Sequence, residues 1–216
     1  MSEEVRLETF LELMNPEVPA DLLALEEKAL GDGVPIIRRP VQSFLRFFLN
    51  VKKPGRILEV GTAVGFSALW MDRFSPEGCT ITTMEKSPER AAEARAHFAE
   101  FQAQDRITLL EGDAAELLKG LSGTYDLIFM DAAKGQYIHF LPEVKRLMAG
   151  GSVLISDNML RDGELIESRF AVTRRNRTIH SRMREYLFAL KEDPELETVL
   201  MDLGDGLALS VKKEEK

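Results

Sequence analysis

The feature that most constrains the fold is an alternation of short apolar runs with helical stretches, which begins after Pro54-Gly55. Apolar runs of strand length occur at residues 56–61, 80–85, 106–112, 125–131 and 152–158. Between them stand the helix-like stretches FSALWMDRF, SPERAAEARAHFAEFQA, DAAELLKGL and YIHFLPEVKRLM. Strands that alternate with helices predict a mostly parallel, doubly wound sheet of the α/β class.

The two ends of the chain depart from this alternation. Residues 1–53 predict helices, one of which carries Pro40 near its first turn. The ending ELETVLMDLGDGLALSVKK predicts an antiparallel hairpin around the Gly204-Asp205-Gly206 turn. With no internal repeat or linker, we predict one domain over residues 1–216, with a helical cap (1–53) and a Rossmann-like core (54–216).

Composition excludes several classes of protein. The single cysteine, Cys79, rules out an intramolecular disulfide and a cysteine-based zinc site. No apolar run approaches the ~18 residues of a membrane span, and the acidic N-terminus is unlike a signal peptide. We therefore expect a cytoplasmic protein that makes no membrane contact.

The net charge of −8 argues against general adhesion to nucleic acid. Between Arg161 and Glu185, however, seven arginines stand against four acids. The arginines are Arg161, Arg169, Arg174, Arg175, Arg177, Arg182 and Arg184. This segment is either a solvated helical face or a contact for an anion or RNA.

Three successive strand ends predict a cofactor site, because ligands of parallel sheets sit beyond the carboxyl ends of the strands. The loop LEVGTAVGFS has glycines at 61 and 65, which is not the dinucleotide pattern GxGxxG and disfavours a nicotinamide cofactor. Glu85 ends the next strand and can accept both hydroxyls of a ribose, or is a plain surface carboxylate. Asp113 and Ala114 follow the third strand at an adenine position, where Asp113 can equally cap the next helix.

The motifs ILEVGTAVGFS, TMEKSPE, EGDA, FMDAAKGQY and ISDN resemble the class I S-adenosylmethionine-dependent methyltransferases. More narrowly, they resemble the metal-dependent O-methyltransferases that act on catechols and caffeoyl-CoA. The resemblance implies that Glu59, Gly61 and Ser67 line the methionine end of the cofactor. It also implies the remaining cofactor contacts, which are Ile37 as a cover, Glu85 at the ribose, Asp113 and Ala114 at the adenine, and Asp131.

Two further strand ends carry oxygen ligands. Asp131 follows the apolar run 125–130, and Asp157 and Asn158 follow the run 152–156. Two carboxylates and a carboxamide suit Mg²⁺, although Asp131 can instead cap a helix while Asp157 and Asn158 form a turn. Lys134 is the candidate general base beside that cation, with a surface lysine as the alternative. Asp131 and Lys134 are thus the predicted catalytic residues.

The acceptor is predicted from the resemblance as well. The arginine run and the ending LGDGLALSVKK look most like a bacterial branch that methylates 5-hydroxyuridine at the wobble position of tRNA. Arginines can engage RNA phosphates, and His180 and Tyr186 either stack on bases or pack within a helix. A small catechol or phenol is the alternative acceptor, and a non-catalytic binding module is a third possibility. We also expect a homodimer, with Trp70 and the phenylalanines of SFLRFF in the core or at its interface.

Overall fold

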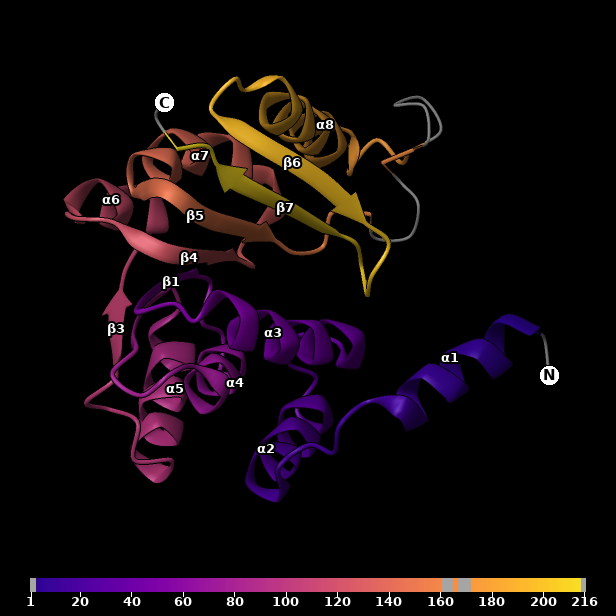
Figure 1. Cartoon of the computed structure of the whole chain (residues 1–216), viewed down its shortest axis with the longest axis vertical. Coiled ribbons are helices and arrows are strands. Elements are labelled where there is room, and N and C mark those ends of the chain that lie inside the picture. Colours follow the sequence, from indigo (N-terminus) through magenta and orange to yellow (C-terminus); the bar gives the residue numbers. More distant parts are fainter. Residues whose placement is uncertain (1–2, 161–164, 167–171, 215–216) are drawn as a thin grey trace.

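A computed structural model describes residues 3–160, 165–166 and 172–214 of the chain. Seven strands form one sheet in the order β3-β2-β1-β4-β5-β7-β6 (Figure 1). Their bounds are β1 Arg56–Val60, β2 Thr80–Glu85, β3 Ile107–Glu111, β4 Tyr125–Met130, β5 Met148–Ser156, β6 Leu196–Met201 and β7 Leu207–Lys212. The predicted mostly parallel sheet with an antiparallel C-terminal hairpin is confirmed.

The sheet reverses its direction of growth at β1. The chain runs outward from β1 through β2 to β3 and then returns to place β4 on the other side of β1. All pairs from β3 to β5 are parallel, whereas β7 pairs antiparallel with both β5 and β6. A crevice opens at such a reversal, because the loops after β1 and β4 leave in opposite directions.

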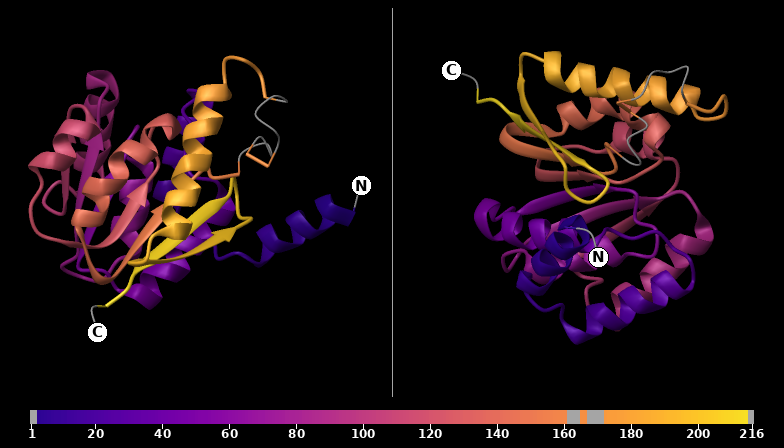
Figure 2. Two further views of the ribbon diagram at one scale, coloured as in Figure 1. Left: turned by 90° about the horizontal axis from the view of Figure 1, so that it is seen from above. Right: turned by 90° about the vertical axis from the view of Figure 1, so that its right-hand side faces the viewer.

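Helices cover both faces of the sheet (Figures 1 and 2). Their bounds are α1 Glu3–Met14, α2 Ala20–Gly31, α3 Arg39–Lys52, α4 Phe66–Phe74, α5 Pro88–Glu100, α6 Ala114–Gly120, the short 3-10 helix η1 Lys134–Gln136, α7 Tyr137–Arg146 and α8 Arg177–Glu192. Alternation along the strands separates two cores. Ile57 packs with α2 to α5, whereas Leu58 packs with α6, α7 and α8.

Local signals set several helix ends. Ser87 accepts a hydrogen bond from the backbone N–H of Arg90 and Pro88 occupies the first position of α5, so both residues favour a helix start here. Trp70 is buried and donates its indole N–H to the carbonyl of Gln42, which ties α4 to α3. Of the neighbouring phenylalanines, Phe44 and Phe48 pack against the core while Phe47 is exposed.

The strand β5 begins earlier than the sequence predicted. Its first residue is Met148 rather than Ser152, and α7 ends at Arg146. Met148 pairs with Tyr125 ahead of an irregularity in β4. The strand therefore includes Gly150 and Gly151, whose low strand propensity predicts a loop.

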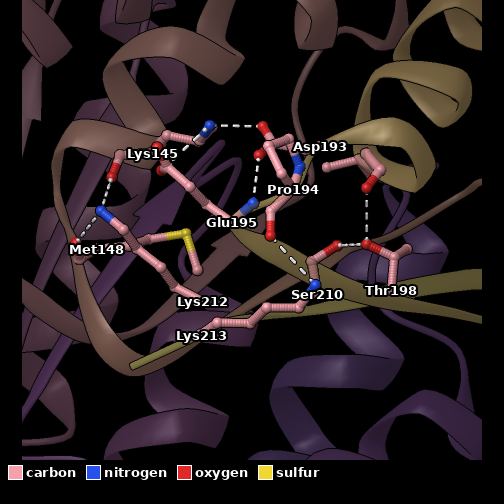
Figure 3. A network of polar contacts seen from close by, with 10 residues as sticks. Lys145, Met148, Asp193, Pro194, Glu195, Thr198, Ser210, Lys212 and Lys213 are labelled. Atoms are coloured by element: carbon pink, nitrogen blue, oxygen red, sulfur yellow. Dashed lines mark hydrogen bonds and ion pairs between the residues drawn. The ribbon is translucent and has the colours of Figure 1, made fainter. Parts of the chain in front are cut away.

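A polar network fastens the C-terminal hairpin to the end of α7 (Figure 3). Lys145 pairs with Asp193 at 2.5 Å and with Glu195 at 3.3 Å. Lys212 Nζ donates to the carbonyls of Lys145 and Met148 at 3.2 and 2.9 Å. The hairpin that carries the Gly204–Gly206 turn is therefore held in register with β5.

The helix α1 extends away from the rest of the molecule, with the N-terminus at its far end (Figures 1 and 2). Phe10, Leu11, Leu13 and Met14 are exposed on it. Among the described residues, no helix is both long and apolar enough to cross a membrane.

Candidate active site

A cavity of about 900 Å³ lies beyond the carboxyl ends of β1 to β5. It is also lined by the segment before α3 and by the turn between β6 and β7. The predicted site residues that line it are Ile37, Gly61, Ser67, Glu85, Asp113, Ala114, Asp131, Lys134, Asp157 and Asn158. The topology thus brings residues from five strand ends to one site.

The loop between β1 and α4 begins on a glycine for a steric reason. Gly61 has φ +106°, and a Cβ there would collide with the carbonyl group of Asp131. The absence of a side chain lets the end of β1 lie directly against the end of β4. The predicted cofactor loop and the predicted metal ligands are therefore neighbours.

Glu85 fixes the loop from the next strand. Its Oε2 accepts the backbone N–H of Ala63 at 2.8 Å, and its Oε1 accepts that of Ser87 at 2.8 Å. The side chain is half-buried and lines the cavity. These contacts argue against the alternative that Glu85 is a plain surface carboxylate.

Asp113 caps α6, as the alternative for this residue predicted. Its Oδ1 accepts the backbone N–H of Ala115 at 3.0 Å, and its Oδ2 pairs with Lys86 at 2.8 Å. The capping role leaves the carboxylate on the cavity wall, beside Ala114. A helix cap and a ligand contact are compatible at this position.

Glu59 is the one predicted site residue that does not line the cavity. It is fully buried behind it, where the Thr83 hydroxyl donates to Oε2 at 2.5 Å. Burial raises the pKa of Glu59 to about 7, although the Thr83 hydrogen bond opposes the shift. Thr83, which in turn lies 2.5 Å from Thr62, was not identified from the sequence. The signal was its inward position in TITTME, on the same strand face as Ile81.

The ends of β4 and β5 bring the three predicted metal ligands together. Asn158 Nδ2 donates to Asp131 Oδ1 at 2.7 Å, and the backbone N–H of Asn158 donates to Asp157 Oδ1 at 2.6 Å. Asp131 does not cap the following helix, since η1 has Ala133 at its N-cap and no side-chain cap. Asp157 and Asn158 do not form a regular turn; Asn158 has φ +65°, and the next residue, Met159, donates its backbone N–H to the carbonyl of Gly206.

The two carboxyl groups share a poorly solvated region. Burial and the charge of Glu59 raise the pKa of Asp131 to about 6. Burial and the charge of Asp131 raise the pKa of Asp157 to about 7. The positive charge of Lys134 opposes both upward pKa shifts in part. Lys134 is half-buried and lines the cavity, which argues against the alternative that it is a surface lysine.

This donor set fits a hard divalent cation, because two crowded carboxylates gain from a positive charge between them. Binding through the Asn158 oxygen requires a half-turn of the amide, whose nitrogen faces Asp131. Within the described ranges, no group of three or more His, Cys, Asp or Glu residues is arranged to hold a metal. The trio has two such residues and an amide.

Three charged residues of the cavity wall, Arg38, Lys86 and Asp205, were missed by the sequence reasoning. Arg38 Nη2 pairs with Asp205 Oδ1 at 2.9 Å and joins the N-terminal cap to the hairpin turn. From the sequence, Asp205 predicted only a turn. Nothing local in the sequence brings that turn to the site.

The arginine-rich segment contributes the helix α8 beside the site. Arg182 donates to the carbonyl of Gly135, next to Lys134, at 3.2 Å. Arg174 and Arg175 are exposed, and Arg161 and Arg169 lie outside the described residues. His180 and Tyr186 are buried, which confirms the packing alternative for both and excludes base stacking in this conformation.

Comparison with known proteins gives the same family for most of the chain. The profile of the O-methyltransferase family matches residues 25–213. A catechol O-methyltransferase of Niastella koreensis is 31% identical over 162 residues, which cover 68% of this chain and 73% of that protein. A putative O-methyltransferase of Mycolicibacterium vanbaalenii is 29% identical over 195 residues, or 89% and 84% of the two chains.

Two solved structures share the fold over nearly their full length. A methyltransferase of Podospora anserina, solved with SAH bound, has a TM-score of 0.89 at 27% identity and covers 99% of this chain and 97% of its own. A putative caffeoyl-CoA O-methyltransferase of Staphylococcus aureus has a TM-score of 0.85 at 26% identity, with 96% and 97% coverage. The predicted S-adenosylmethionine-dependent O-methyltransferase is thus confirmed at the level of the family, because the chain belongs to the O-methyltransferases.

Proposed function

We propose that the protein transfers the methyl group of S-adenosylmethionine to an acceptor hydroxyl that stands beside a second oxygen, with Mg²⁺ as the metal. One observation carries the proposal. The loop and acids suited to the cofactor share a single cavity with the acidic trio and Lys134.

The cofactor would lie across the ends of β1, β2 and β3. Glu85 would accept the ribose hydroxyls, and Asp113 and Ala114 would flank the adenine. Gly61 and Ser67 would line the methionine end, supported from behind by Glu59, while Ile37 covers the site. The position of these residues on one cavity wall, apart from Glu59, supports this assignment.

Asp131, Asp157 and Asn158 would hold the cation. When bound, Mg²⁺ supplies a positive charge that stabilises the developing oxyanion of the acceptor. Two adjacent oxygens on the acceptor suit this site, since an octahedral ion leaves positions for substrate and water.

Lys134 would take the proton that the acceptor hydroxyl releases. The acceptor oxygen then attacks the methyl carbon in line, a carbon–oxygen bond forms, and the carbon–sulfur bond breaks. Holding the two reactants in line contributes about 7–11 kcal/mol to lowering such a barrier. The proximity of Lys134 to both carboxyl groups supports its role, because a cation held between them would favour the neutral amine that accepts a proton.

For the acceptor, we propose 5-hydroxyuridine in tRNA, where the 5-hydroxyl stands beside the 4-carbonyl. The exposed Arg174 and Arg175 support a contact with RNA phosphates, since α8 packs next to Lys134 through Arg182. A small catechol is the second candidate, favoured by relatives that are catechol O-methyltransferases. We also propose a homodimer, supported by the exposed apolar side chains of α1.

One experiment separates the acceptors. The purified protein is incubated with S-adenosylmethionine and Mg²⁺ and given either tRNA that contains 5-hydroxyuridine or a panel of catechols. Nucleoside mass spectrometry of the tRNA should show conversion to 5-methoxyuridine, which chelation of the metal should abolish. Efficient methylation of catechols alone would establish the second candidate. Tight cofactor binding with no transfer to either would indicate a non-catalytic binding protein.

A further inference from the structure

A buried histidine stands behind the cofactor loop, outside the catalytic cavity. His97 belongs to the last turn of α5 and is 6% exposed. Its Nδ1 lies 2.8 Å from the carbonyl oxygen of Val64, in the loop between Gly61 and Gly65. Its Nε2 lies 3.3 Å from Nζ of Lys28, on α2. One imidazole therefore connects three segments that are far apart in the sequence.

The partners assign the tautomer of the ring. A carbonyl oxygen only accepts, so Nδ1 must carry the hydrogen and donate it to Val64. An ammonium only donates, so Nε2 must be the acceptor of the Lys28 hydrogen bond. Both contacts are satisfied by one neutral form of the ring.

The contact with Val64 holds one peptide unit of the loop. In a trans peptide the carbonyl of Val64 and the N–H of Gly65 point in opposite directions. The carbonyl is bound by His97, and the N–H donates to the carbonyl of Thr62 at 2.8 Å. A rotation of this unit would break both hydrogen bonds, so the pair fixes its orientation.

The helix that carries His97 also touches the loop directly. A Cβ on Gly65 would lie 2.6 Å from the ring of Phe98, the residue after His97. The loop is thus packed against α5 without space for a side chain. Glu85 restrains the loop through Ala63 from β2, and His97 restrains it through Val64 from α5.

Lys28 extends the connection to the N-terminal cap. Ala29, Val34 and Val64 form a small apolar cluster, and a cavity of about 110 Å³ beside it is lined by Lys28 and His97 together with Asp32 and Glu93. The segment that follows α2 carries Ile37 over the main cavity. The His97 ring therefore contacts both the cap, through Lys28, and the loop, through Val64.

We infer that His97 is a positioning residue for the cofactor loop, and that Lys28 docks the cap onto the loop through it. The inference rests on the proposed placement of the cofactor against this loop. It goes beyond the catalytic assignments, because His97 does not line the cavity of about 900 Å³ and contacts no residue proposed to bind the metal.

The test compares two substitutions that both remove the imidazole ring of His97. The amide nitrogen of His97→Asn can reach the position of Nδ1 and still donate to Val64, whereas His97→Leu leaves that carbonyl without a donor. The dissociation constant for S-adenosylhomocysteine is measured by calorimetry and the melting temperature by scanning fluorimetry. We expect His97→Leu to weaken binding about tenfold and His97→Asn to stay within about threefold of the wild type.

Three more variants complete the design. Lys28→Met should weaken binding about threefold, since it removes only the partner that fixes the ring. His139→Leu, at an exposed position of α7, should bind like the wild type. Glu85→Gln reports on the proposed cofactor site itself, because its carboxylate lines the main cavity.

The outcomes are distinct. If Glu85→Gln binds normally, the cofactor placement fails and the inference with it. If Glu85→Gln is weakened while the His97 variants change only the melting temperature, His97 is merely structural and the inference is overturned. Equal weakening by Asn and Leu also overturns it. Should His97→Leu not fold, Lys28→Met decides, since unchanged affinity in that variant removes the proposed docking.

Discussion

The two halves of the cavity differ in how their polar groups are satisfied. On the half proposed to bind the cofactor (the cofactor half), at the ends of β2 and β3, Glu85 accepts two backbone N–H groups and Asp113 combines a helix cap with an ion pair. On the half proposed for the acceptor (the acceptor half), at the ends of β4 and β5, burial raises the pKa values of Asp131 and Asp157, and the charges of Glu59 and Asp131, respectively, raise them further. The carboxylates of the first half are held by backbone hydrogen bonds and an ion pair, whereas the carboxyls of the second half lie close together with little solvent.

This difference suits the first half to binding the cofactor and the second half to catalysis. Groups already fixed by backbone contacts cost little further ordering when a ligand arrives, so the cofactor half is preorganised. Crowded buried carboxylates destabilise the fold and persist where a ligand needs them, which is typical of catalytic sites. Substitutions in the two halves should therefore affect different steps.

The largest effect is expected at Asp157. Asp157→Ala should lower kcat/KM about a thousandfold with Mg²⁺ present, because a charged ligand of the proposed cation is lost. Affinity for S-adenosylhomocysteine should change by less than about threefold. Steady-state kinetics and calorimetry check both values, with the exposed Asp202→Ala as the matched control. Loss of cofactor affinity in parallel with activity would break the division into halves.

The next effect is expected at Lys134. Lys134→Met should lower kcat about a hundredfold, the usual size of a lost general base, and leave cofactor affinity intact. The deficit should shrink as pH approaches the pKa of the acceptor hydroxyl, since the proton then leaves without help. The pH dependence of kcat measures this, and the exposed Lys119→Met is the control. A deficit that is constant with pH would assign Lys134 to binding.

On the cofactor half, Glu85→Gln should weaken S-adenosylhomocysteine binding about tenfold, because a charge-assisted hydrogen bond to the ribose becomes a neutral one and the amide accepts only one of the two backbone N–H groups. At saturating cofactor, kcat should stay within about threefold. Glu111 pairs with Glu85 in the register of β2 and β3 and is exposed, so Glu111→Gln is a control on the same sheet edge. A kcat defect larger than the binding defect would contradict preorganisation of this half.

The smallest effect is a pH-dependent stabilisation by the metal. Because their folded pKa values of about 6 and about 7 exceed the ordinary 3.8, Asp131 and Asp157 contribute stability at low pH that is lost as pH rises through those values. Excess Mg²⁺ should offset that loss and raise Tm by about 3–6 °C near pH 8. Near pH 5 both carboxyls hold their protons, so Tm should barely change. Equal shifts at both pH values would show binding elsewhere.

Local sequence patterns sufficed for much of the site. The glycine of the first loop and the acids at residues 85, 113, 131 and 157 lie at the ends of recognisable strands or directly after them, and parallel strands present their carboxyl ends at one sheet edge. The predicted start of β5, at Ser152, was wrong, because pairing of Met148 with Tyr125 in the sheet outweighed the low strand propensity of Gly150 and Gly151.

The sequence by itself therefore determined the order of the elements, the fold class and the strand ends at which the candidate site residues lie, since each depends on periodicity over a few residues. The tertiary structure alone decided that Asp205 reaches the cavity from a distant turn, that Glu59 lies behind its wall, and that His97 bonds to Val64. These placements depend on strand register and on packing between segments far apart in the chain. Neither strand register nor packing between distant segments can be predicted from a local stretch of residues.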